Sequence, residues 1–202
     1  MTRPAVRLMS PPDVPHVVAL QIRFLEGSLV TELGPRFLTR FHEAALEHPL
    51  TRAFVAADDG GSIVGLALGS LDVHQFNGHV KPRVLAALVR SLLSRHGLTL
   101  TWRFACVLVE REPQPHIPAE LLLLVVDARV RRQGIGQRLL TALESEFARE
   151  GVRLYRVAVR SQLEAARAFY LALGFEREQE LLVLGHPMTY LTKRVQWRSR
   201  AC

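Results

Sequence analysis

The sequence predicts a single α/β domain, and three stretches carry this prediction. Residues 121–126 form the uninterrupted apolar run LLLLVV, which is typical of a strand buried on both faces. A helical stripe follows it, made of Ile135, Leu139, Leu140, Leu143 and Phe147. A second strand and helix are expected at 154–159 and 163–173. Residues 53–57 and 63–71 are expected to be strands on either side of the turn sequence DDGG, which predicts a hairpin.

The other elements follow from shorter signals. We expect a first strand at 6–9, a helix start at the SPPD turn, and an amphipathic helix through residues 14–25. A second helix is expected around 37–46, between Gly34-Pro35 and Pro49. Two last strands are expected at 175–184 and 188–195, joined by residues 185–187. The domain thus covers residues 1–196, and 197–202 form a basic tail.

Residues 75–116 are predicted to be an insertion between the third and fourth strands. A strong helical stripe occupies 84–93, and the alternation from Leu98 to Val109 favours a strand, although helical spacing fits there too. We expect the insertion to cover one side of the functional site. The alternatives are that it extends the core or makes a homodimer contact.

Composition excludes several classes of protein. The chain of 202 residues has 49% hydrophobic residues and a net charge of +7, and its pI is about 10.4. No apolar run is long enough to cross a membrane, and the first residues lack the apolar core of a signal peptide. With Cys106 and Cys202 as the only cysteines, no disulfide is expected, and a cytoplasmic location is predicted.

The loop before the predicted helix at 135–147 has the chemistry of an anion site. Arg131, Arg132, Gln133, Gly134, Ile135 and Gly136 stand at its N-terminus. The first N–H groups of a helix have no intrahelical partner and carry partial positive charge. Glycines at 134 and 136 would let an anion approach the backbone, and the arginines add fixed charge. This pattern predicts a phosphate or pyrophosphate cradle.

The same residues carry a resemblance to a known family. Arg131 to Gly136, with Val126 shortly before, resembles the acetyl-CoA pyrophosphate motif of the GNAT acetyltransferases. Downstream, Ala166, Phe169, Tyr170, Gly174 and Phe175 resemble a second motif of that family. Leu163 departs from it, because the family usually has Asn there.

The resemblance implies a fold and a co-substrate site. It implies a mixed, mostly antiparallel sheet splayed at its centre, between strands 121–126 and 154–159. The pantetheine of acetyl-CoA would lie in that gap along Leu124, Val125 and Val126, as an added strand does. The pyrophosphate would lie on residues 131–136, and Ala166 and Tyr170 would complete the site. The minimal family fold needs only a short connection between its third and fourth strands, so the resemblance implies that the 75–116 insertion covers the acceptor side.

Glu120 is the candidate catalytic base. An attacking amine must be neutral, so a group or a water chain has to accept its proton. Glu120 lies 11 positions before Arg131, the spacing of the catalytic glutamate in the histone-acetyltransferase branch of the family. Apolar neighbours would raise the pKa of its carboxyl. The alternative is a solvated glutamate at the strand entrance, with Glu110 and Glu112 as further candidates in the insertion.

Tyr170 is the candidate catalytic acid. A phenol keeps its proton at neutral pH and can donate it to a departing thiolate, and the resemblance places this role at Tyr170. The alternative is a tyrosine that only packs on the core.

The sequence therefore predicts an N-acetyltransferase that moves an acetyl group to a primary amine by direct attack. The acceptor is a small-molecule amine or a protein amine. The scattered histidines give no metal spacing, so no metal is expected. One rival function is a basic nucleic-acid-binding module, which would favour arginines interleaved with exposed aromatics. The other is an inactive, acyl-CoA-binding regulator, for which Leu163 is the support.

Overall fold

The computed structural model describes residues 3–25, 31, 34–91, 117–183 and 185–195, without the side chains of 84–91. In chain order the elements are β1 (Ala5–Leu8), the 3-10 helix η1 (Pro11–Asp13), α1 (Val14–Phe24), α3 (Pro35–Glu47), β2 (Thr51–Ala57), β3 (Ile63–Ser70), α4 (Val73–Ser91), β4 (Glu120–Val126), the 3-10 helix η2 (Ala128–Val130), α6 (Ile135–Arg149), β5 (Leu154–Arg160), α7 (Glu164–Ala172), β6 (Glu176–Val183) and β7 (His186–Arg194). Each predicted element in these ranges is present, with ends shifted by a few residues except at α4, which begins well before its predicted stripe at 84–93.

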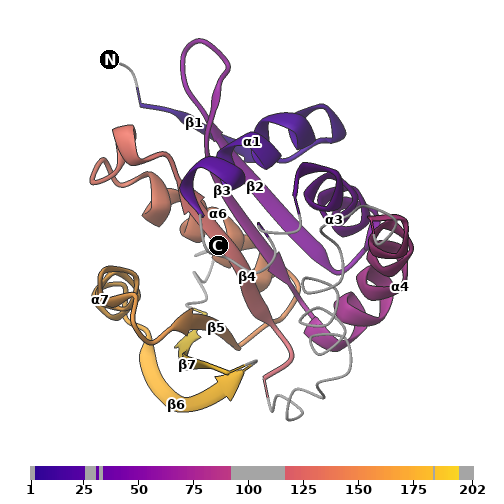
Figure 1. The fold of residues 1–202 in the computed structure, drawn as a ribbon. Helices are drawn as coiled ribbons and strands as arrows, with labels where there is room; N and C mark the ends of the chain where they lie inside the picture. The colour runs from indigo at the N-terminus through magenta and orange to yellow at the C-terminus, as the bar shows by residue number, and fades with distance from the viewer. Residues whose placement is uncertain (1–2, 26–30, 32–33, 92–116, 184, 196–202) are drawn as a thin grey trace.

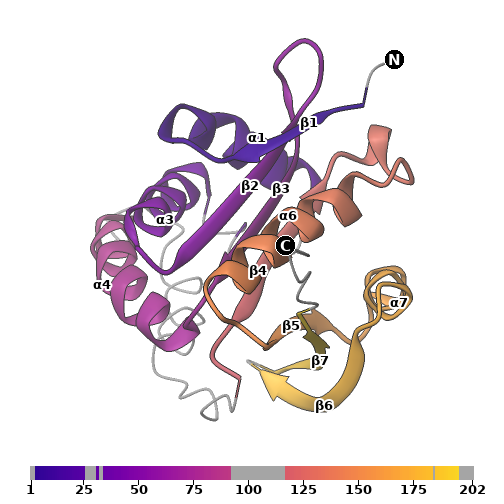
Figure 2. The same ribbon diagram turned by 180° about the vertical axis from the view of Figure 1, so that it is seen from behind.

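The strands form one seven-stranded sheet in the order β1-β2-β3-β4-β5-β7-β6. All neighbours are antiparallel except β4 and β5, which are parallel. Figures 1 and 2 show β5, β7 and β6 turning away from β4, so that the sheet has two halves. The predicted mixed and mostly antiparallel α/β fold is confirmed.

Two apolar clusters hold the layers together, one on each face of the sheet. On one face, α1, α3 and α4 contribute residues such as Val17, Leu38 and Phe76 to a core with β2, β3 and Val125. On the other, the stripe of α6 packs on β3, β4 and β5. All five residues of that predicted stripe are buried. Because β4 contributes to both cores, it lies at the centre of the molecule.

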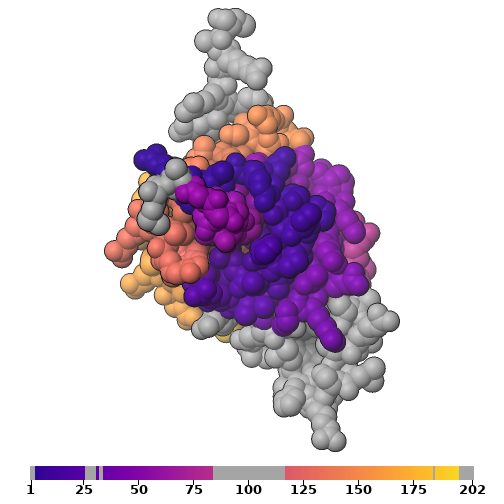
Figure 3. All heavy atoms as spheres, turned by 90° about the horizontal axis from the view of Figure 1, so that it is seen from above, coloured from indigo at the N-terminus to yellow at the C-terminus, as the bar shows by residue number. Residues whose placement is uncertain are grey.

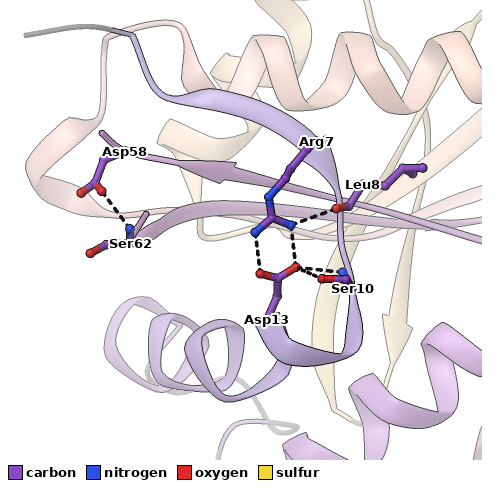
Figure 4. Close-up of polar contacts among 6 residues, drawn as sticks. All are labelled: Arg7, Leu8, Ser10, Asp13, Asp58 and Ser62. Atoms are coloured by element: carbon purple, nitrogen blue, oxygen red, sulfur yellow. Dashed lines mark hydrogen bonds and ion pairs between the residues drawn. The ribbon is translucent and has the colours of Figure 1, made fainter. Parts of the chain in front are cut away.

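The entry into α1 is held by an ion pair with Asp13. The guanidinium of Arg7 donates to both carboxylate oxygens of Asp13, at 2.7 and 2.6 Å, and the N–H and hydroxyl of Ser10 donate to Oδ2 (Figure 4). These bonds hold the pKa of Asp13 well below its usual range. In the hairpin turn, Asp58 accepts from the backbone of Ser62 (Figure 4). The SPPD and DDGG signals thus produce the turns that they predicted.

Two elements begin earlier than the sequence predicts. Helix α4 begins at Val73, because Asp72 Oδ1 accepts from the backbone N–H groups of His74 and Gln75. Its residues Phe76 and Val80 are buried in the core, so this part of the 75–116 segment extends the core. Strand β7 begins at His186, inside the expected linker. Residues 92–116, with the Leu98–Val109 segment, Glu110 and Glu112, lie outside the described residues.

Helix α6 lies close to the sheet because β3 carries glycines under it. A Cβ at Gly69 would lie 2.9 Å from Leu143 Cδ2 and from Phe147 Cζ. A Cβ at Gly65 would lie 2.9 Å from Leu139 Cδ1. Real carbon atoms do not approach so closely, so a side chain at either position would push α6 away from the sheet.

We therefore expect Gly69→Ala to lower the free energy of unfolding by about 1–3 kcal/mol through overpacking. Gly78→Ala is the matched control. Gly78 is exposed in α4 and nothing lies within 4 Å of its Cβ position, so alanine should raise that free energy by about 0.5–1 kcal/mol. Urea unfolding of the three proteins measures both changes, and equal effects of the two substitutions would contradict the close packing of α6.

Candidate functional site

The central feature of the site is the short ladder between β4 and β5. The two strands pair only at Glu120↔Arg156 and Leu121↔Val157. Beyond these pairs, β4 stays paired with β3 as far as Val126, and β5 stays paired with β7 as far as Arg160. The two strands therefore part after their first residues, and the splay implied by the family resemblance is present in the fold.

A bulge in β4 accompanies the separation. In the pairing with β3, Leu123 faces Leu68 and Leu121 faces Gly69, so Leu122 is an extra residue in β4. A bulge bends its strand and turns the following side chains. Leu124 and Val126 accordingly pack toward α6, whereas Val125 lies in the core on the opposite face.

The connection from β4 to α6 is fixed by Asp127. Its side chain is buried and accepts from the backbone and guanidinium of Arg129, with Oδ2 at 2.6 Å from Nη2. The hydrogen bond from Arg129 lowers the pKa of Asp127, against an opposing effect of burial. Further along, the Arg131 Nε donates to the carbonyl of Val126 at 3.1 Å. Two arginines therefore hold the loop against the end of β4.

Residues 131–134 are exposed at the surface. In Figure 3 the salmon residues of the β4–α6 region lie beside the indigo and purple N-terminal elements. Gly134 is the N-cap of α6 with φ 74°, in the left-handed region, and α6 has neither a side-chain cap nor an acidic residue in its first turn. Its first internal hydrogen bond runs from the Arg138 N–H to the Gly134 carbonyl. The N–H groups of residues 135–137 thus lie ahead of the helical ladder, where an anion is favoured.

The two glycines of the loop have different surroundings. At Gly134 nothing lies within 4 Å of the Cβ position. At Gly136 a Cβ would lie 3.3 Å from Phe169 Cζ and 3.7 Å from Val126 Cγ2. Gly134 therefore leaves room for a ligand, whereas Gly136 lets α7 pack against the start of α6. The sequence had suggested anion access at both positions.

Two further arginines have buried nitrogens beside these elements. Within the described residues, Arg138 Nη1 and Arg167 Nε have no hydrogen-bond partner. Arg138 lies in the first turn of α6 and Arg167 lies in α7. A buried cationic donor without an acceptor is costly, and a phosphate group would supply one. Sequence reasoning missed both residues, although a basic residue four positions after Gly134 was a usable signal.

Tyr170 and Ala166 lie on α7, beside the same core. The Tyr170 ring packs edge-on against Phe169 and Phe175, with centroid distances of 5.2 and 5.1 Å. Burial raises the pKa of its phenol. Ala166 is partly buried in the same cluster. Leu163, where the family motif has Asn, is 49% exposed at the N-terminus of α7 and gives that helix no side-chain cap.

Glu120 lies at the closed end of the splay and is buried. Its Oε2 lies 2.7 Å from both Nε and Nη2 of Arg156, and the side chains of the two residues are 10% and 5% exposed. The sequence had suggested apolar neighbours that would favour the protonated form. The guanidinium instead favours the carboxylate anion. Arg156 was missed because it lies 36 positions away, inside a strand of otherwise apolar pattern.

Comparison with known proteins agrees with this geometry. Residues 20–175 match the Acetyltransferase (GNAT) family, so the chain belongs to that family. The crystal structure of SsHAT matches with a TM-score of 0.72 and 25% identity, over 97% of this chain and 100% of that one. A histone acetyltransferase HPA2 and related acetyltransferase from Corynebacterium glutamicum matches with a TM-score of 0.62 and 18% identity, over 98% and 99% of the chains. Naa20 from Chaetomium thermophilum, in complex with a bisubstrate analogue, matches with a TM-score of 0.58 and 18% identity, over 95% and 86%. A search of curated proteins gave no match.

The described part of the chain shows neither a membrane-spanning helix nor a metal-binding cluster. No helix there combines the length and apolar character needed to cross a bilayer. No group of three or more His, Cys, Asp or Glu side chains in the same residues is arranged to hold a metal ion.

The loop geometry supplies a matched test of the phosphate cradle. Asparagine and aspartate both tolerate the left-handed conformation of Gly134 and have nearly the same shape. We expect Gly134→Asp to weaken CoA binding by about tenfold or more relative to Gly134→Asn, because only the aspartate sets a negative charge beside the phosphates. Calorimetric titration with CoA measures the affinities, and melting temperatures check that both variants fold alike. Equal affinities of the two variants would place the phosphates elsewhere.

Proposed function

We propose that this protein is an acetyl-CoA-dependent N-acetyltransferase acting by direct attack of a primary amine. The observation that carries the proposal is the parting of β4 from β5 beside the uncapped, arginine-flanked start of α6. It gives an extended ligand a strand edge for its polar chain and a helix terminus for its phosphates. Membership of the GNAT acetyltransferase family supports the same chemistry.

The residues present suit acetyl-CoA as the co-substrate. Backbone groups of Leu124, Val125 and Val126 would bond the pantetheine, and those of residues 131–136 would bond the pyrophosphate. The donors of Arg131, Arg132 and Arg138 lie on the loop and in the first helical turn, where they suit phosphate oxygens. Gln133 and Ile135 contribute backbone N–H groups, and Ala166 keeps the facing side of α7 small.

Glu120 is proposed as the base that receives the proton of the attacking amine, through a water where the distance requires one. It lies on β4, and the neighbouring residues of this strand would bond the pantetheine. The Arg156 ion pair keeps its carboxylate ionised, as acceptance of a proton requires. A backbone N–H near Val126 would stabilise the oxyanion that forms at the thioester carbon.

Tyr170 is proposed as the acid that protonates the departing thiolate. Because burial raises the pKa of its phenol above the ordinary value, the hydroxyl remains protonated throughout the pH range of an assay. It therefore holds a proton when the thiolate leaves, whose ordinary pKa is near 8.5. The acceptor is proposed to be a small-molecule amine or a protein amine, and screening amines for release of free CoA would identify it.

Removal of the Tyr170 hydroxyl should lower turnover without affecting stability. The phenylalanine ring keeps the packing on Phe169 and Phe175, and only the proton donor is lost. We expect Tyr170→Phe to reduce kcat on the order of 10²-fold, with unchanged melting temperature and acetyl-CoA affinity. Steady-state kinetics beside a thermal melt separates this outcome from loss of packing or of binding.

Tyr155→Phe is the matched control for this experiment. The Tyr155 hydroxyl is buried and donates to Glu144 at 2.5 Å, in a contact that also includes Lys193. Its loss should lower the melting temperature and leave turnover per folded molecule unchanged. A Tyr170→Phe enzyme with normal turnover, when transfer limits the rate, would rule out the acid role.

A further inference from the structure

Arg156 makes two kinds of contact in the interior. Its Nε and Nη2 both reach Glu120 Oε2 at 2.7 Å, and its guanidinium carbon lies 4.9 Å from the centre of the Tyr190 ring. All three residues are buried, with exposures of 8% for Glu120, 4% for Arg156 and 3% for Tyr190. A buried guanidinium is stable only when it is paired and well packed, and here it has both kinds of support.

The ion pair is located where the two halves of the sheet part. Glu120 and Arg156 face each other in the first of the two β4–β5 register pairs. One pair later, the strands separate and the gap proposed for acetyl-CoA begins. The contact thus links the half that would carry the pantetheine to the half formed by β5, β7 and β6, at the point where they separate.

We propose that Arg156 is a positioning residue for Glu120 in acetyl transfer, fixing its carboxylate oxygen and keeping it ionised. This inference rests on the proposed function, and it assigns a role to a residue that is not proposed to bind acetyl-CoA or the amine. Arginine suits the role because it stays charged at every assay pH and its planar fork donates two bonds to one oxygen.

The proposed role of Arg156 predicts the direction in which the pH dependence of turnover changes. A base acts only when ionised, so turnover falls as pH drops through the titration of Glu120. An adjacent guanidinium favours the carboxylate and therefore moves that titration to lower pH. Removal of the cation should therefore move the acidic limb of the rate profile to higher pH, into the neutral range. A purely structural ion pair would change the melting temperature and leave the limb in place.

The elements around the ion pair carry further titratable side chains. On β7 it is the Tyr190 phenol, whose ring covers the guanidinium. On β6 it is Glu176, which pairs in register with Thr192, the partner of Arg156 on β7. Beyond β3 it is Asp72, two residues after Ser70, the register partner of Glu120; its carboxylate is held by the backbone of His74 and Gln75. Of these groups, Arg156 is the one that carries a positive charge.

The test compares pH profiles of kcat and kcat/KM for five variants and the wild type. Arg156→Met removes the cation, and Arg156→Lys keeps the charge but not the fork. Glu120→Gln removes the base, and the double variant Glu120→Gln with Arg156→Met removes both charges, which spares the interior an unpaired ion. Arg153→Met is the control, because Arg153 is exposed just before β5 and has no place in the site.

We expect Arg156→Met to move the acidic limb up by about one to three pH units, with about tenfold lower kcat at pH 6.5 and recovery above pH 8. Arg156→Lys should keep the limb near its wild-type position with a several-fold lower kcat. Glu120→Gln should lose the limb with kcat about 10²–10⁴-fold lower, and the double variant should be equally slow, because Arg156 then has no carboxylate to act on. The KM for acetyl-CoA should stay within about twofold throughout, as the ion pair makes no contact with the phosphate cradle.

Several results would overturn the proposal. A wild-type limb position in Arg156→Met, at normal turnover per folded molecule, would leave the ion pair with a structural role only. If Arg156→Met does not fold, two other variants decide. A folded double variant that is faster than Glu120→Gln would contradict coupling through Glu120. An unchanged kcat in Arg156→Lys would contradict it as well. The failure of the proposed function is distinguishable, because the wild type would then release no CoA with any amine.

Discussion

The rest of the structure depends on the loss of the hydrogen-bond ladder between β4 and β5. Two neighbouring strands at the centre of a sheet normally satisfy each other's N–H and C=O groups along their whole length. Here pairing stops after two residues on each strand. The polar edges beyond that point need another partner, and an extended molecule with amide groups is a chemically suitable one. The interior of the sheet thereby becomes a binding surface.

The separation is stable because each half of the sheet is stabilised by strand pairing and packing away from the gap. Strand β4 is paired with β3 and covered by apolar residues on both faces, with α6 seated on the glycines of β3. Strand β5 is paired with β7 over its full length, and the ring of Tyr155 packs between Phe147 and Phe175. At the junction the buried ion pair of Glu120 and Arg156 links the two halves. The same framework therefore fixes both the width of the gap and the groups around it.

Local sequence patterns predicted most of the fold, because the information lies within a few residues. The apolar run of β4, the stripe of α6 and the SPPD turn each obey a rule that short segments can express. The sequence prediction missed the start of α4, because the apolar stripe beginning at Val84 is a stronger signal than the capping residue Asp72. The surroundings of Glu120 could not be read locally, because its partner Arg156 comes from a strand 36 positions away. Gly136 is a similar case: the sequence suggested anion access there, and only the packing of α7 showed Phe169 against it.

The central claim is that the gap beside β4 and the start of α6 form one binding surface for CoA. Amide hydrogen exchange tests this most directly, because it reports on the backbone groups themselves. Addition of saturating CoA should slow exchange at Leu122–Val126 and in the first turn of α6, while β2, which is paired with β1 and β3 away from the gap, stays unchanged. Protection confined to other elements, or protection of the α6 start without any at β4, would contradict the account.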